Sequence, residues 1–217
     1  FGQLPHVQLF RGDVLNHALD RLLNEFLPNG ISRKMVSNLP YYITTPILFH
    51  FWESPVFFST MVVMVQEEVA IRLTALPDSS EYSALSIAAR LYADTDIVHH
   101  VPRTCFRPQP EVDSCIVRFR NLAGGRFPDV SPQTVMKVVR AAFSHKRKTL
   151  RNTLTRSGAF GAPRQVVEEA ANAAGIDLSR RPQTVSPEEF VRLSREIASR
   201  LTATAPDATK NGPGTTE

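Results

Sequence analysis

Short apolar runs and segments with helical spacing alternate through the first half of the chain, and this alternation constrains the fold more than any other feature. Residues 60–65 are apolar and rich in β-branched side chains, which favours a strand buried in a parallel sheet. We expect strands at residues 7–10, 34–37, 60–65, 97–101 and 112–119. We expect helices at residues 17–27, 45–52, 67–76 and 83–92. Strands that alternate with helices predict an open α/β sheet.

After residue 130 the pattern becomes purely helical. Ser131-Pro132 has the form of a helix N-cap followed by proline at the first helical position, and Ser186 with Glu189 has the form of a capping box. The Gly124-Gly125 pair marks a linker between the two patterns. The sequence therefore predicts an α/β domain at residues 1–125, a small all-helical domain at 126–201 and a disordered tail at 202–217, which is rich in Ala, Thr, Pro and Gly.

The chain has a formal net charge of +4, but its charge is unevenly distributed. Residues 131–164 contain eight basic residues and no acidic one. A block of one sign favours a nucleic-acid partner, because ordinary solvated helix faces usually mix signs. The candidate phosphate contacts, which we expect on one helix, are Lys146, Arg147, Lys148 and Arg151.

Composition argues against several other classes of protein. The hydrophobic content of 42% is enough for a buried core, and no apolar run is long enough to span a bilayer, so we expect a cytoplasmic protein. Cys105 and Cys115 have no paired-cysteine spacing, and no histidine is placed in sequence to complete a ligand set. We therefore expect no metal site and two buried, reduced thiols.

The segment Asn38-Leu39-Pro40-Tyr41 is the most informative one for chemistry. It follows an expected strand, and ligands of open α/β sheets bind beyond the carboxyl ends of the strands. Asn38 offers a side-chain carbonyl and Leu39 a backbone carbonyl that can accept from an exocyclic amine of a base. Pro40 stiffens the turn, and Tyr41 offers an aromatic face to a base lifted from its stack. The alternative is a proline turn that ends a strand beside a core tyrosine.

Two further residues are candidates for the same site. Asp13 follows an expected strand, where a carboxylate can accept from the amine of an adenosine cofactor, although helix caps and turns are commoner places for Asp. Phe106 lies in a proline-stiffened loop that can present its ring to a base, although core packing is the usual role of a phenylalanine.

Several separate segments together resemble KsgA-type ribosomal RNA adenine dimethyltransferases. The segments that carry the resemblance, in the same order as in that family, are residues 38–46, 65–73, Phe106 with 112–114, 146–154, 175–177 and 180–182. The resemblance implies a class I (Rossmann-like) methyltransferase fold with S-adenosyl-L-methionine as donor. It also implies N6,N6-dimethylation of two adjacent adenosines in the 3′-terminal hairpin of small-subunit ribosomal RNA.

The resemblance also assigns residues and partners. It makes Asp13 and Asn38 cofactor contacts, residues 38–41 the methyl-acceptor site, and Phe106 a second wall for the target base. It implies binding to small-subunit ribosomal RNA or the immature small subunit, a role in small-subunit biogenesis, and a monomer.

The chain departs from the family pattern in two places. Tyr82-Ser83 stands where the family usually has Tyr-Gly, and the glycine-rich cofactor loop and the acidic residue for the ribose lie upstream of Asp13 in the family. The family strand order is 3-2-1-4-5-7-6, with residues 7–10 as strand 3 and 34–37 as strand 4. We therefore expect a sheet that lacks its first two strands, an unpaired edge at residues 34–37, poor pairing of residues 1–15, and an inactive fragment.

Two other functions remain open from the sequence. One is a large-subunit ribosomal RNA adenine methyltransferase of the macrolide-resistance type, which the segment from Arg180 to Phe190 disfavours. The other is a non-catalytic relative that binds RNA or DNA, which the intact Asn38-Leu39-Pro40-Tyr41 segment and Phe106 disfavour.

Overall fold

The computed structural model describes residues 4, 6–27, 31–145, 147–156 and 161–204. It divides the chain into two compact units, one comprising residues 1–136 and the other residues 137–217. The domain limit expected at residue 125 lies inside the first unit. None of the described helices is both long and apolar enough to cross a membrane.

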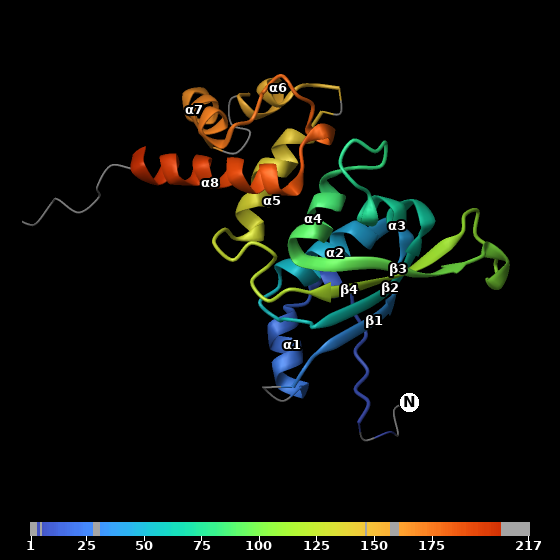
Figure 1. The fold of residues 1–217 in the computed structure, drawn as a ribbon. Coiled ribbons are helices and arrows are strands. Elements are labelled where there is room, and N and C mark those ends of the chain that lie inside the picture. Colours follow the sequence, from blue (N-terminus) through green and yellow to red (C-terminus); the bar gives the residue numbers. More distant parts are fainter. Residues whose placement is uncertain (1–3, 5, 28–30, 146, 157–160, 205–217) are drawn as a thin grey trace, which may run out of the picture. The chain divides into compact units, whose positions relative to one another are not determined.

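A four-stranded mixed sheet forms the centre of the first unit (Figure 1). Its strands are β1 (Lys34–Asn38), β2 (Thr60–Gln66), β3 (Ala93–Val101) and β4 (Ser114–Asn121). They lie in the order β1-β2-β4-β3, with β1 parallel to β2 and β4 antiparallel to both of its neighbours. This is the order 4-5-7-6 that the resemblance implied for these four segments.

The strand expected at residues 7–10 is wrong, because these residues take no regular secondary structure. In the implied order this segment does not border β1, and a strand without a neighbour cannot satisfy its backbone groups in a ladder. β1 pairs with β2 on one side, and among the described residues no strand pairs with its other side. Val36, in the middle of β1, is 84% exposed, so the unpaired edge expected at residues 34–37 is confirmed.

The four helices expected in the first unit are present. They are α1 (Leu19–Phe26), α2 (Thr44–Glu53), α3 (Glu67–Thr74) and α4 (Ala84–Tyr92), and α3 and α4 pack against the sheet. Met61, Val63 and Val65 alternate along β2 and are completely buried, so one face of the strand belongs to the core.

Ser83 is the N-cap of α4, at one of the two places where the chain departs from the family pattern. Its backbone N–H donates to the hydroxyl of Ser86 at 3.0 Å, and that hydroxyl donates to the carbonyl of Arg72 in α3. The backbone of Ser83 is extended, with a φ of −154°, which any residue adopts. Serine therefore suits this position, and the hydroxyl of Ser86 links α4 to α3.

The second unit is helical, as expected. α5 (Pro132–Ala142) contributes its last turns, and α6 (Leu150–Leu154), α7 (Arg164–Ala174) and α8 (Pro187–Thr204) lie wholly within the unit. The predicted capping box is present, since Glu189 N donates to Ser186 Oγ and Ser186 N donates to Glu189 Oε2. α8 runs to Thr204, so the expected start of the tail at residue 202 is too early. Residues 205–217 lie outside the described residues.

Candidate functional site

The carboxyl end of β1 carries the first part of the candidate site. Asn38 is the last residue of the strand, and Leu39 is buried with its N–H donating to the carbonyl of Met64 in β2. Pro40 is the N-cap of a 3₁₀ turn (Tyr41–Ile43), and the hydroxyl of Thr44 donates to its carbonyl at 3.0 Å. These bonds hold the backbone of the segment while the side chain of Asn38 is exposed.

Tyr41 is anchored to the start of β4. Its hydroxyl lies 2.6 Å from the hydroxyl of Ser114, the first residue of β4, and Ser114 is completely buried. The ring of Tyr41 therefore cannot rotate away without breaking a hydrogen bond inside the protein.

A loop between β3 and β4 supplies the other wall of the site. Arg103 holds this loop, because its N–H donates to the carboxylate of Asp113 and its guanidinium donates to the carbonyl of Glu111. Phe106 follows the 3₁₀ turn Arg103–Cys105 and is half-buried.

These elements line an open cavity of about 410 Å³. Its lining residues are Asn38, Leu39, Pro40, Tyr41, Phe106, Pro108 and Pro110. All five residues that the sequence analysis proposed as catalytic therefore line one cavity, although Phe106 is far from the others in sequence. An amide, backbone carbonyls and two aromatic rings suit a flat polar ligand such as a nucleobase.

Asp13 has a local structural role. It is the N-cap of a 3₁₀ turn (Val14–Asn16), and its carboxylate accepts from Leu15 N at 3.0 Å and from the side-chain amide of Asn16 at 3.3 Å. The cavity beside Asn38 is lined by other residues. The cofactor contact expected of Asp13 stays a prediction.

The basic residues do not share one helix, contrary to our expectation. Arg147 and Lys148 are exposed in the turn between α5 and α6, and Lys146 lies outside the described residues. Only Arg151 is helical, in α6, where its guanidinium lies 2.9 Å from the carboxylate of Glu168. The helix expected here is interrupted because Thr149 is the N-cap of a new helix.

The family model described as "Ribosomal RNA adenine dimethylase" matches residues 3–199. The chain belongs to this family. Proteins named ribosomal RNA small subunit methyltransferase A are similar to this chain. The one from Desulfitobacterium hafniense is 44% identical over 192 residues, which cover 87% of this chain and 67% of the relative. The one from Shouchella clausii is 39% identical over 197 residues, which cover 91% of this chain and 67% of the relative.

The chain thus spans about two thirds of the length of these relatives, and 65% of another from Pelotomaculum thermopropionicum. Solved structures share its fold. A dimethyladenosine transferase from Plasmodium falciparum, 24% identical, aligns over 77% of this chain and 68% of its own with a TM-score of 0.67. The 23S rRNA methyltransferase ErmE, 25% identical, aligns over 83% and 76% with a TM-score of 0.56.

The expectation of two buried thiols holds for only one of the cysteines. Both thiols are free, but Cys105 is exposed and only Cys115 is buried. Cys115 lies with Glu67 and His100 in a group whose ligand atoms are all within 4.8 Å of one another, so a histidine does complete a candidate ligand set. Burial raises the pKa of the Cys115 thiol, and the carboxylates of Glu67 and Asp113 raise this pKa further.

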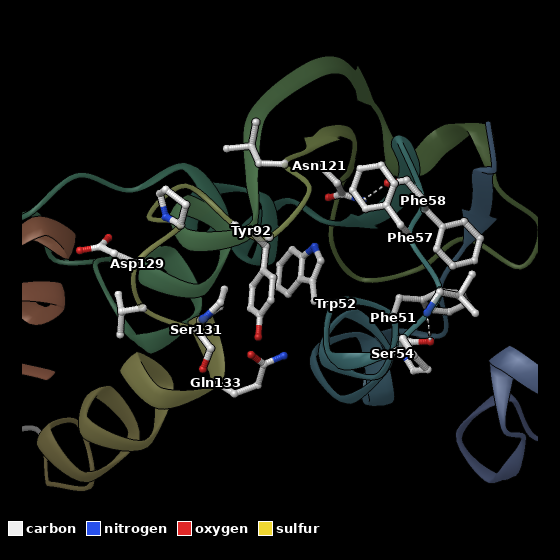
Figure 2. Close-up of a pocket in the computed structure, with 18 residues that line it drawn as sticks. Phe51, Trp52, Ser54, Phe57, Phe58, Tyr92, Asn121, Asp129, Ser131 and Gln133 are labelled. Atoms are coloured by element: carbon white, nitrogen blue, oxygen red, sulfur yellow. Dashed lines mark hydrogen bonds between the residues drawn. The ribbon is translucent and has the colours of Figure 1, made fainter. Parts of the chain in front are cut away.

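The first unit has a second cavity, which sequence reasoning missed (Figure 2). It measures about 470 Å³ and is lined by the end of α2, the following segment to Phe58, Asn121 at the end of β4, and the turn that leads into α5. The rings of Trp52 and Tyr92 stack in it with centroids 5.4 Å apart. Asn121, which lines this cavity, ends β4, whereas Ser114 begins that strand. Thr60 and Gln66 are correspondingly the two ends of β2. The cavity therefore lies at the opposite end of the strands from Asn38. The only sequence signal for it is the aromatic density of residues 49–58.

Proposed function

We propose that this chain is the acceptor-binding and RNA-binding part of an enzyme that dimethylates N6 of adenosines in small-subunit ribosomal RNA. The targets under this proposal are two adjacent adenosines in the 3′-terminal hairpin of that RNA, methylated during biogenesis of the subunit. The observation that supports it most is the single cavity in which Asn38, Leu39 and Tyr41 face the loop of Phe106.

The chemistry of the cavity suits an exocyclic amine as the acceptor of a methyl group. The lone pair of such an amine is delocalised into the ring, so the amine becomes a better nucleophile when acceptors hold its N–H groups and its nitrogen becomes pyramidal. Asn38 Oδ1 and the Leu39 carbonyl are the acceptors in this proposal. Tyr41 and Phe106 hold the base between their rings.

S-adenosyl-L-methionine supplies an electrophilic methyl group on a sulfonium sulfur. Asn38 and the Leu39 carbonyl would hold the amine that receives this methyl group. Among the described residues, Asn38 suits a contact with the methionine part of S-adenosyl-L-methionine, because it ends β1 at the carboxyl edge of the sheet. Asp13 accepts two hydrogen bonds within its own turn, and its contact with the cofactor stays a prediction.

The exposed turn between α5 and α6 is the RNA contact in this proposal. Arg147 and Lys148 are fully accessible cations that can approach phosphates, whereas Arg151 shares its charge with Glu168. The partner is small-subunit ribosomal RNA, and the protein acts as a monomer.

A small-subunit substrate is preferred over a large-subunit one for two reasons. The three relatives compared above, which are 39–44% identical to the chain, bear small-subunit names. The segment that the sequence analysis used against the large-subunit alternative is also an ordered part of the second unit, since Arg180 forms a two-pronged ion pair with Glu189. A non-catalytic role is disfavoured by the intact cavity around Asn38.

The test compares Asn38→Ala with Asn24→Ala, an exposed asparagine on α1, in the chain joined to the part of the Desulfitobacterium hafniense relative that it does not cover. Unmethylated small and large ribosomal subunits are the two substrates. We expect the Asn38 variant to lose about 100-fold or more in methyl transfer to the small subunit with RNA affinity unchanged, because one preorganised polar contact to the reacting group is removed. Wild-type turnover by this variant, or equal methylation of large subunits, would contradict the proposal.

A further inference from the structure

Three potential metal ligands converge at one edge of the sheet, next to the acceptor cavity but outside its lining. Cys115 is the second residue of β4, and His100 lies directly opposite it in β3. Glu67 begins α3 immediately after Gln66, which pairs with Ser114. The ladder therefore holds the backbones of His100 and Cys115, and Glu67 N donates to the carbonyl of Asp113 at 3.1 Å.

The distances within this cluster resemble the edges of a tetrahedral zinc site. Cys115 Sγ lies 3.3 Å from His100 Nδ1, and the same nitrogen lies 3.5 Å from Glu67 Oε1. Zinc bound to sulfur at about 2.3 Å and to nitrogen or oxygen at about 2.0–2.2 Å gives sulfur–nitrogen and nitrogen–oxygen edges of roughly 3.6 and 3.4 Å. All three ligand atoms lie within 4.8 Å of one another, and rotation about the side-chain bonds of Glu67 can bring its oxygen closer to the sulfur.

The cluster also has one closed side and one open side. The residue Cys115 is completely buried, whereas the side chains of His100 and Glu67 are 67% and 44% exposed. An ion can therefore enter from solvent past the imidazole and the carboxylate and meet the thiol below them. The fourth position stays open to water, as it does in three-ligand zinc sites.

We propose that Glu67, His100 and Cys115 bind one zinc-class divalent cation. A ligand set of sulfur, imidazole nitrogen and carboxylate oxygen selects zinc or cobalt over magnesium and calcium, which prefer oxygen alone. On binding, the Cys115 sulfur forms a bond to the metal and its proton leaves to the buffer. The site is independent of the proposed methyl-transfer function.

The position of the site gives the metal a structural consequence. It ties the start of α3 to β3 and β4, one residue along from Ser114, whose hydroxyl meets that of Tyr41. Metal binding therefore stabilises the strand ends behind the acceptor cavity, and the bound chain unfolds at a higher temperature than the free chain.

The experiment titrates cobalt and zinc into the chelator-treated 217-residue chain carrying Cys105→Ser, which removes the exposed thiol. We expect one equivalent of cobalt to give tetrahedral visible bands and a thiolate-to-cobalt charge-transfer band, and zinc to displace it and raise the melting temperature. His100→Ala, Glu67→Gln and Cys115→Ser should each weaken cobalt binding more than about 100-fold, since even an outer-shell change costs about 10–100-fold.

The chain offers a matched control for each ligand. His99→Ala and Glu68→Gln change exposed neighbours of two ligands, and the Cys105→Ser background controls for the third. These variants should bind cobalt as the parent does. His100 and Glu67 are accessible, so their variants should fold without metal, and circular dichroism can verify this. These two variants keep the test valid if Cys115→Ser does not fold. A missing charge-transfer band at one equivalent, or equal losses in the His99 and His100 variants, would overturn the proposal and leave only a thiol–imidazole hydrogen bond.

Discussion

The hydroxyl of Tyr41 lies 2.6 Å from the hydroxyl of Ser114, so the turn after β1 is bonded to the first residue of β4 across the intervening strand β2. Ser114 is completely buried and Tyr41 is half-buried. The bond orients an aromatic ring that lines the candidate acceptor cavity. It therefore couples the geometry of the cavity to the pairing of the sheet.

Replacing Tyr41 by phenylalanine should separate the ring from its anchor. We expect Tyr41→Phe, in the extended enzyme, to lower the methylation rate about fivefold, which is the effect of losing roughly 1 kcal/mol of hydrogen bonding. Ser114→Ala should have a similar effect, and the double variant should cost less than the sum because both changes remove the same bond. Tyr42→Phe is the control, since Tyr42 is 86% exposed. Fully additive losses in the rate assay would contradict the coupling.

Removing the two exposed cations between α5 and α6 should change how salt affects RNA binding. We expect Arg147→Gln with Lys148→Gln to weaken binding of a ribosomal RNA hairpin and to flatten the plot of log affinity against log salt. The slope should fall by about 0.9 for each phosphate that is no longer neutralised, on the duplex scale. Arg200→Gln is the control, because Arg200 pairs with Glu196 on the same helix. An unchanged slope in filter-binding titrations would refute the assignment of this turn to RNA.

The ion pair between Arg180 and Glu189 should make the second unit sensitive to acid. Its guanidinium hydrogen bonds hold the pKa of Glu189 below its ordinary value of 4.5, despite partial burial that opposes this shift, and the N–H of Ser186 lowers the pKa further. A carboxyl group whose pKa is lower in the folded state stabilises the fold above its unfolded pKa, and this contribution is lost as the pH falls through the folded value.

We therefore expect Glu189→Gln to lower the free energy of unfolding by about 2 kcal/mol at neutral pH, the scale of a hydrogen bond to a charged group. The difference from the parent chain should shrink as the pH falls below about 4.5, the ordinary Glu pKa. Glu188→Gln alters the exposed neighbour and should cost much less. Urea unfolding at a series of pH values measures both variants, and a constant difference down to about pH 3 would contradict the coupling.

The local structure of the chain, meaning its strands, turns and several of its helices, could be predicted from residue patterns alone. The capping box at Ser186, the helices of the first unit, and the four strands of the sheet follow from side-chain spacing and from hydrogen bonds between near neighbours. The segment from Asn38 to Tyr41 was recognisable as an acceptor site because its chemistry is contained in four consecutive residues. These features depend on contacts close in sequence, so a pattern of residues can encode them.

The meeting of distant residues depended instead on how the strands assemble. Residues 7–10 have a strand-like pattern but find no strand to pair with, and backbone pairing cannot be read from one segment alone. The order β1-β2-β4-β3 brings the ends of β2, β3 and β4 together, and thereby gathers Glu67, His100 and Cys115 from positions whose spacing carries no ligand motif. It was long-range strand pairing, with the burial that accompanies it, that turned a buried cysteine and an exposed histidine into neighbours.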